Sequence, residues 1–235
     1  MSEIIVALDL PSGEQALDLV DGLGESVGFY KVGSPLFTRA GPAFIAELRA
    51  RGRRIFLDLK YHDIPSMVAH AVAAAADMDV ELITLHASGG EAMMRAAREA
   101  VGDDGPRLLG VTILTSFTAV DVEQVWNKEI NSVREEVARL TSLAVDAGLH
   151  GVVASPLEVE SLKRRHGADL IVVTPGIRPA GERMGDQART ATPAEAARAG
   201  ADFLVIGRPV LTATDPLAVV RGIRSELAAS SEVAR

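Results

Sequence analysis

The sequence predicts an α/β protein made of a single (β/α)8 TIM barrel, and three observations lead to this fold class. Short apolar runs alternate with Ala- and Leu-rich stretches of helical character along all 235 residues. Eight such runs occur, which suits the eight strand–helix units of a closed barrel of this length. The runs are almost continuously apolar, which indicates parallel strands buried on both faces under a cover of helices. A doubly wound open sheet is the alternative, but no G-x-G-x-x-G motif follows the first run.

Each apolar run is predicted as one strand. The strands cover residues 4–10, 28–33, 53–60, 82–87, 107–115, 151–155, 170–176 and 203–208. The predicted helices lie between them and cover residues 12–23, 36–51, 65–78, 89–101, 133–147, 156–166, 192–199 and 215–229. Thr-Pro at 192–193 and Asp-Pro at 215–216 are typical helix starts. Gly52, Gly148 and Gly200 suit helix ends, where a left-handed backbone favours glycine.

Two connections are longer than the others. Residues 116–131 hold the only tryptophan and are predicted as irregular surface with a short helix inside 119–127. Residues 177–191 are polar and follow the carboxyl end of a strand, which favours a lid over a binding site. The whole chain, 1–235, is predicted as one domain, with a frayed tail at 230–235.

Composition narrows the function classes. The net charge of −8 argues against a nucleic-acid or anionic-membrane partner, although a small anionic substrate can still bind in a local basic pocket. No cysteine is present, so disulfides and thiolate chemistry are excluded, and a reducing cytoplasm is expected. No secretory signal is visible, and no apolar run approaches the roughly 18 residues of a membrane span.

Polar residues or glycines stand at the carboxyl end of every predicted strand. They are Asp9, Lys31, Asp58 with Lys60, His86, Thr115, Ser155, Gly176 with Arg178, and Gly207 with Arg208. In a barrel of parallel strands these ends share one rim, where enzymes of this fold place their chemistry. Because the residues come from distant parts of the chain, their convergence points to an active site more strongly than any single motif.

The segment FLDLKYHDIP, residues 56–65, concentrates charge at the end of a buried strand. Strand alternation puts Asp58 and Lys60 on one face, toward the barrel mouth, and the intervening leucine on the other. Buried charges must pair with each other or with a group such as Lys31. A purely structural ion pair is the alternative. With Lys31 and Asp63 the charges alternate in sign, and such a network can keep an ammonium protonated, desolvated and ready to donate a proton.

The same rim offers an anion site. Gly176 and Gly207 can present backbone N–H groups to a phosphate, and Arg178 and Arg208 can add charge-assisted hydrogen bonds. Phosphate sites in barrels often lie after strands seven and eight, which is where these residues stand. The histidines show no spacing typical of metal ligands, so no metal site is predicted.

With these motifs in place, the sequence resembles the orotidine 5′-phosphate decarboxylase family from end to end. The matching segments are ALDL, YKVG, FLDLKYHDIP, HASGG, VTILTS, VTPGIRP, GDQAR and VIGRPV. The D-x-K-x-x-D-I-P string is the most specific of them. The resemblance implies a (β/α)8 homodimer that converts orotidine 5′-monophosphate to UMP in pyrimidine biosynthesis without metal or organic cofactor.

The resemblance also implies a role for each matching residue. Lys60 matches the family's proton donor, and Lys31, Asp58 and Asp63 match the rest of its charged network, with Asp63 reaching into the neighbouring subunit's site. The residues matching substrate contacts are Asp9 and Lys31 at the ribose, Thr115 near the pyrimidine, and Arg178, Gln187, Gly207 and Arg208 at the phosphate, with Gln187 on the lid. Ser66 stands where relatives often carry Thr or Asn, and it keeps a hydroxyl.

Two other functions compete with this interpretation. Related sugar-phosphate enzymes, such as hexulose-phosphate synthases and ketogulonate-phosphate decarboxylases, share the D-x-K-x-x-D string but use Mg²⁺, with a carboxylate where this chain has Lys31. A cation there would repel the metal. A catalytically silent nucleotide-phosphate sensor is the second alternative, but binding alone does not require alternating buried charges.

Overall fold

Eight parallel strands close into a barrel in the computed structural model, which describes residues 2–179 and 189–233. The strands are β1 (Glu3–Ala7), β2 (Phe29–Gly33), β3 (Arg54–Tyr61), β4 (Leu82–His86), β5 (Arg107–Val111), β6 (Gly151–Val153), β7 (Ile171–Thr174) and β8 (Phe203–Ile206). Each strand pairs with the next in the chain, and β8 pairs with β1. The barrel is therefore confirmed, and the alternative of an open doubly wound sheet is wrong.

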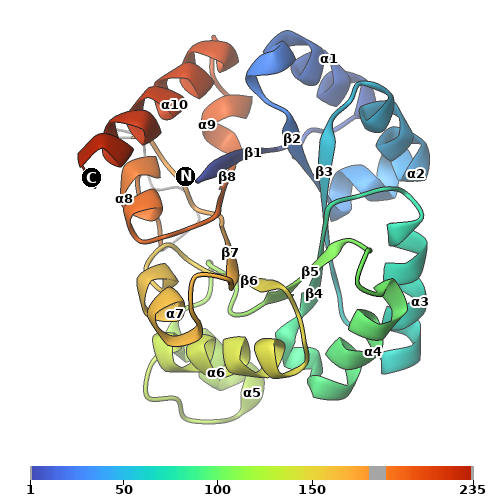
Figure 1. Ribbon diagram of the computed structural model, residues 1–235, viewed down its shortest axis with the longest axis vertical. Helices are drawn as coiled ribbons and strands as arrows, with labels where there is room; N and C mark the ends of the chain where they lie inside the picture. The colour runs from blue at the N-terminus through green and yellow to red at the C-terminus, as the bar shows by residue number, and fades with distance from the viewer. Residues whose placement is uncertain (1, 180–188, 234–235) are drawn as a thin grey trace.

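Helices surround the ring of strands, as Figure 1 shows. They are α1 (Gly13–Leu23), α2 (Ser34–Ala50), α3 (Pro65–Ala76), α4 (Glu91–Val101), α5 (Ala119–Trp126), α6 (Val133–Asp146), α7 (Val159–His166), α8 (Pro193–Arg198), α9 (Arg208–Leu211) and α10 (Pro216–Val233), with 3-10 turns η1 (Gly24–Ser26) and η2 (Ala87–Gly89). Side chains cap several of them: Thr118 and Thr192 each form a capping box at the start of α5 and α8. The short helix expected inside 119–127 is α5, whereas α9 was not predicted.

Most strands are shorter than the apolar runs that predicted them. The strand predicted to reach Thr115 ends at Val111, and the one predicted to reach residue 10 ends at Ala7. One residue past each point the backbone still bonds to the neighbouring strand, through the N–H groups of Leu8 and Thr112, and the rest of each run forms the loops of the barrel rim. Asp9 and Thr115 therefore stand on these loops, just past the ends of their strands.

The core has two layers, one inside the barrel and one between the strands and the helices. The inner layer contains Phe29, Phe56, Leu109 and Phe203, with the rings of Phe29 and Phe203 edge to face at 5.6 Å. The outer layer contains the strand residues that face the helices, such as Leu57. Burying each large apolar side chain stabilises the fold by about 2 kcal/mol. The inner layer thus forms a solid floor beneath the carboxyl ends of the strands.

The C-terminal helix extends further than the sequence predicted. It was expected to end near residue 229, but α10 continues to Val233, into the segment 230–235 that was expected to fray. Fraying of that tail in solution stays a prediction. Across the described ranges, 2–179 and 189–233, we find no helix with the length and apolarity that crossing a membrane requires.

Candidate active site

A cavity of about 310 Å³ opens at the carboxyl ends of the strands. Inner-layer residues, including Phe56, Val173 and Val205, form part of its wall. The predicted site residues that line it are Asp9, Lys31, Asp58, Lys60, Thr115, Arg178, Gly207 and Arg208. This volume falls in the range of small-molecule binding pockets. The structure therefore brings eight of the predicted residues to one cavity with a largely apolar floor.

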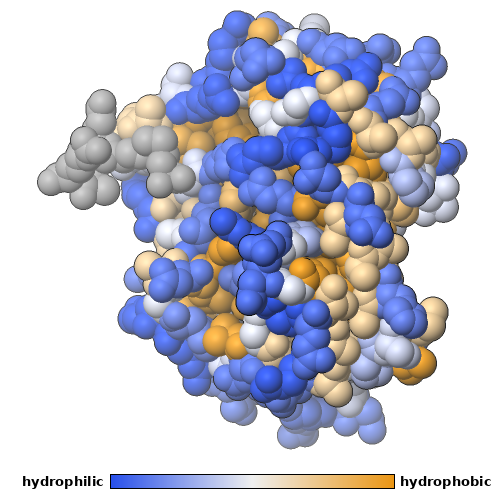
Figure 2. Space-filling model, turned by 45° about the vertical axis from the view of Figure 1, so that its right-hand side comes forward, coloured by the Kyte–Doolittle hydropathy of each residue, from blue (hydrophilic) through white to orange (hydrophobic). Residues whose placement is uncertain are grey.

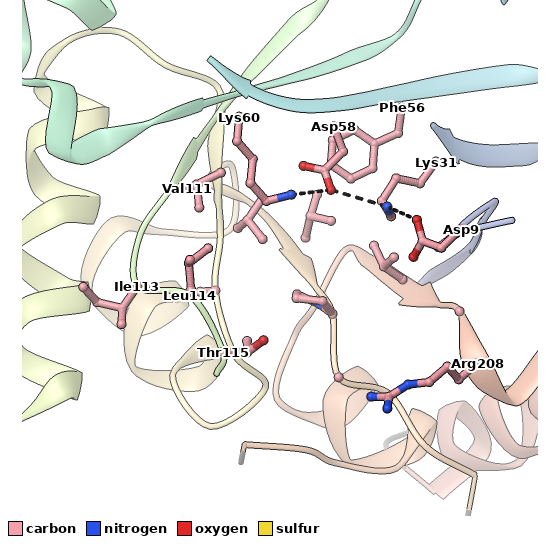
Figure 3. Close-up of a pocket in the computed structure, with 18 of the residues that line it drawn as sticks. Asp9, Lys31, Phe56, Asp58, Lys60, Val111, Ile113, Leu114, Thr115 and Arg208 are labelled. Carbon is pink, nitrogen blue, oxygen red and sulfur yellow. Dashed lines mark hydrogen bonds and ion pairs between the residues drawn. The ribbon is translucent and has the colours of Figure 1, made fainter. Parts of the chain in front are cut away.

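Four of these residues form a continuous row of alternating charge along one side of the cavity (Figure 3). The Lys60 ammonium donates a hydrogen bond to Asp58 Oδ2 at 2.7 Å. The same oxygen lies 3.5 Å from Lys31 Nζ, which in turn donates to Asp9 Oδ1 at 3.0 Å. Asp58 and Lys31 are buried, at 7% and 8% exposure, so water screens this pair weakly. We refer to Asp9, Lys31, Asp58 and Lys60 as the charged row.

Asp58 is held from both of its oxygens. Thr84 of β4 is fully buried, and its hydroxyl donates to Asp58 Oδ1 at 2.9 Å while it accepts from the Lys60 N–H at 2.9 Å. Burial by itself would raise the pKa of Asp58. The charges of Lys31 and Lys60 and the hydrogen bonds from Lys60 and Thr84 outweigh burial, and the pKa falls below its ordinary value. Asp58 is therefore an anion that cannot easily turn away from the cavity.

The backbone at Lys60 is unusual. Its φ of 53° lies in the left-handed region, which costs a residue with a side chain about 1 kcal/mol or more. The pairing of β3 with β4 also shifts register between Leu57 and Tyr61, as at a β-bulge. Bulges re-aim side chains next to active sites. Simple alternation predicted the correct face for Asp58 and Lys60, but it did not predict that the strand is distorted where Lys60 enters the cavity.

Gly33, at the end of β2, leaves room for the charged row. A Cβ atom at this position would lie 3.0 Å from Lys31 Nζ and 3.3 Å from Asp9 Oδ1. Its φ is −93°, which any residue can adopt, so the restriction comes from space and not from the backbone. A side chain at position 33 would press directly on the Lys31–Asp9 ion pair. The sequence analysis did not identify this requirement.

Figure 3 shows Thr115 and Arg208 across the cavity from the Lys60–Asp58 pair. Gly207 lies near the other end of the charged row, where a Cβ atom on it would be 3.7 Å from Asp9 Oδ2. Arg178 is buried at 9% exposure and follows β7, after a left-handed Gly176 with a φ of 83°. Gly207 is the N-cap of α9, and Arg208 is its first residue. Two arginines beside an apolar pocket give this part of the cavity the charge and the donors that a phosphate requires.

Three predicted residues are not placed at the cavity. Asp63 and Ser66 are exposed and do not line it, and Asp63 Oδ1 accepts from the Ile64 N–H at 2.7 Å. Gln187 lies outside the described residues. His86 also stays off the cavity wall and lies beside His62, with 5.3 Å between ring centroids and the rings tilted by 36°. In the described part of the chain, no cluster of three or more His, Asp or Glu side chains has metal-binding geometry.

The chain is similar to known proteins over nearly its whole length. Residues 2–223 match the model of the orotidine 5′-phosphate decarboxylase / HUMPS family. A relative from Actinobacillus succinogenes named orotidine 5′-phosphate decarboxylase is 50% identical, covering 97% of this chain and 98% of its own. Another of that name from Moorella thermoacetica is 46% identical over 96% of this chain and 92% of its own.

Solved structures give the same result. A crystal structure of orotidine 5′-phosphate decarboxylase from Lactobacillus acidophilus has a TM-score of 0.86 and 38% identity, covering 97% of this chain and 99% of that one. The family model and the curated relatives each span nearly the whole chain, and the segments that carried the resemblance lie within that span. The chain belongs to the orotidine 5′-phosphate decarboxylase / HUMPS family.

Proposed function

We propose that this protein decarboxylates orotidine 5′-monophosphate to UMP, as the names of its relatives indicate, without a metal ion or an organic cofactor. The charged row carries the proposal: two ammonium groups converge on one buried carboxylate at the wall of a nucleotide-sized cavity. The supporting comparison is family membership over nearly the full chain.

Lys60 is the proposed proton donor. Loss of CO₂ from C6 of the orotate ring leaves an electron pair, and so a carbanion, on that carbon. An ammonium fixed beside C6 stabilises the developing negative charge and then transfers its proton to C6, which completes UMP. Asp58 orients the ammonium through the 2.7 Å hydrogen bond.

Asp58 has a second proposed role next to the substrate carboxylate. Two anions held close together in a cavity of low polarity repel each other, and this repulsion ends when CO₂ departs. Meanwhile the attraction between Lys60 and the reacting carbon increases. The row is thus more complementary to the transition state than to the substrate, which is the requirement for catalysis.

The remaining residues are proposed to hold the nucleotide. Asp9 and Lys31 contact the ribose hydroxyls, and Thr115 contacts the pyrimidine. The proposed phosphate ligands are Arg178, Gly207, Arg208 and Gln187, with residues 177–191 as the lid. Phosphate binding supplies energy at a point remote from the reacting carbon, and that energy can be used to enclose the substrate.

We also propose that the protein is a homodimer in which each subunit contributes residues to the other's site. Asp63 and Ser66 lie on an exposed segment whose neighbours Ile64 and Met67 are 62% and 51% exposed. Figure 2 shows hydrophobic residues exposed among charged ones on the face that it brings forward. Apolar side chains as exposed as those of Ile64 and Met67 favour contact with another protein surface. A second copy docked there would place its Asp63 and Ser66 at the rim of the first copy's cavity.

The family description also covers HUMPS enzymes, so a metal-dependent sugar-phosphate reaction must be weighed. Lys31 argues against it, because its ammonium lies 3.5 Å from Asp58 and would repel a divalent cation there. A silent nucleotide sensor is disfavoured for another reason. Holding two lysines on a buried carboxylate costs desolvation that simple binding does not need.

The test is the loss of orotidine 5′-monophosphate absorbance when purified protein is added in EDTA without metal. We expect full conversion to UMP and CO₂. A protein that converts nothing in EDTA but recovers with Mg²⁺ would contradict the proposal and favour the metal-dependent reaction. A protein that binds UMP but releases no CO₂ under either condition would favour the sensor.

A further inference from the structure

Arg189 forms a buried anchor that the sequence did not predict to have a role. Its Nη1 donates to Glu158 Oε1 at 2.9 Å, and the two side chains are only 12% and 5% exposed. Its Nη2 donates to the backbone carbonyls of Ile113 and Leu114, at 3.5 and 3.2 Å. One guanidinium therefore joins the end of the segment 177–191 to the loop after β5 and to the turn before α7.

The groups that accept hydrogen bonds from Arg189 are themselves held in place by other hydrogen bonds. Thr112, just before Ile113, is tied to β6 because its N–H and its hydroxyl both donate to the Val153 carbonyl, at 3.3 and 2.9 Å. Glu158 is the N-cap of α7, and its N–H donates to the Ser155 carbonyl at 3.1 Å. The acceptors of the Arg189 hydrogen bonds thus belong to well-connected parts of the barrel. If these bonds were lost, the segment that carries Arg189 would move and its acceptors would stay in place.

Arg189 is also connected to Arg178 through the backbone. The Ala191 N–H donates to the Gly176 carbonyl at 3.3 Å, and the Arg178 N–H donates to the Ala191 carbonyl at 3.0 Å. These bonds form an isolated β-bridge between Ile177 and Ala191. We call residues 176–178 and 189–191 the loop base. Arg178, Gly176 and Leu114 all line the cavity, so the loop base forms part of its phosphate side.

We infer that Arg189 is a positioning residue: by fixing the loop base to the loop after β5 and to Glu158, it holds Arg178 where the substrate phosphate binds. The inference rests on the proposed function and deepens it. Arg189 does not line the cavity and needs no contact with substrate. Arg189 acts on the substrate only through the position of Arg178, so its loss should weaken binding of the phosphate. Binding of the pyrimidine should not change, because the nearest pyrimidine ligands stand on strands and on the fixed loop after β5.

The test compares Arg189→Ala with the wild type on ligands that differ only in the phosphate. Misplacing a binding group by about 1 Å can cost up to about a hundredfold, so we expect UMP to bind about ten- to a hundredfold more weakly by calorimetry. kcat/KM for orotidine 5′-monophosphate should fall by a similar factor, mainly through KM. kcat/KM for the nucleoside orotidine should change by less than about threefold, because the pyrimidine side is intact. Arg224→Ala, at an exposed site on α10, is the matched control and should change neither value.

A double variant tests the route through Arg178. If Arg189 acts through Arg178, then Arg178→Ala and Arg189→Ala combined should lose little more affinity for UMP than Arg178→Ala alone. Multiplicative losses would overturn the inference, and so would equal losses for orotidine 5′-monophosphate and orotidine.

Two further controls separate the role of Arg189 from a folding defect and from failure of the proposed function. Removing Arg189 alone leaves Glu158 buried without its partner, so the variant pair Arg189→Gln with Glu158→Gln removes both charges and should show the same phosphate-specific loss. A wild type that binds UMP but does not decarboxylate would contradict the proposed function, while the UMP comparison still decides the role of Arg189. A wild type that does not bind UMP would overturn both.

Discussion

Two networks of alternating charge lie at opposite ends of the barrel. Comparing them distinguishes charges that hold the fold together from charges that are proposed to take part in a reaction. At the amino end, Arg54 donates to both carboxylate oxygens of Glu81, at 2.6 and 2.7 Å, and also to Glu3. Its guanidinium carbon lies 4.3 Å from the centre of the Phe29 ring. At the carboxyl end, the charged row joins two lysines to Asp58 and Asp9.

The residue types explain the difference. The hydrogen bond with Glu81 raises the pKa of Arg54 further above an already high value, so this network holds three strands together but exchanges no proton. Lys60 in contrast is a compact ammonium on the wall of a cavity, bonded to a single carboxylate oxygen of Asp58. A lysine can give up a proton in the course of a reaction. Alternating charge alone therefore does not mark a candidate active site, and the carboxyl-end network is the candidate because its Lys60 also faces a cavity.

The largest expected effect comes from breaking the carboxyl-end network at its proposed proton donor. If Lys60 has that role, Lys60→Ala should lower kcat by at least about 10⁴-fold, since it removes both the proton and the charge proposed to stabilise the carbanion. Because Lys60 is about one-third exposed, the fold should survive, which circular dichroism and thermal unfolding would verify. Turnover near the wild-type rate in a folded variant would refute the assignment.

Asp58→Asn should lower kcat by about 10²- to 10³-fold, because it removes the counter-charge that orients Lys60. It also gives a pH signature. The folded state lowers the pKa of Asp58, so ionised Asp58 stabilises the fold above its ordinary pKa of 3.8, and this contribution is lost as the pH falls through the lower folded-state value. The difference in unfolding free energy between wild type and variant should therefore shrink below about pH 4, as measured by denaturant titration. A difference that grows in acid would mean that the pKa is raised.

The contrast also shows what the sequence can and cannot predict. The barrel followed from periodicity, and the cavity residues followed from polar side chains that interrupt apolar runs at strand ends. The bond between Thr84 and Asp58 depends on the register of two strands, although Thr84 occupies an inward position of β4 and so gave a faint signal. The left-handed Lys60 left no such signal. Arg189 ends the matching segment GDQAR, but nothing in the sequence indicates its partners, because the bonded carbonyls lie 75 and 76 residues away in the chain.

Gly33→Ala offers a smaller and more selective perturbation of the carboxyl-end network. A methyl group there presses on the Lys31 ammonium and on Asp9, and both must shift by a few tenths of an ångström. We expect kcat/KM for orotidine 5′-monophosphate to fall by about tenfold, because the row loses its spacing while every charge is kept. Stability should change by less than about 1 kcal/mol, since the side chains involved have room to turn toward the cavity. Unchanged kinetics would show that the row tolerates displacement and that its geometry is less critical than proposed.

The amino-end network supplies the smallest expected effect on catalysis and the sharpest test of the comparison. Arg54→Gln removes the charge while keeping part of the polar contact with Glu81, and the pair is about one-third exposed, so the expected loss of stability is about 1 kcal/mol. The midpoint of denaturant unfolding should fall accordingly, and high salt should reduce the difference because it screens the wild-type network. Steady-state kinetics on orotidine 5′-monophosphate should not change, since the inner core separates this network from the cavity. A large loss of kcat would mean that charge at the amino end reaches the active site through the barrel, and the distinction between the two networks would then fail.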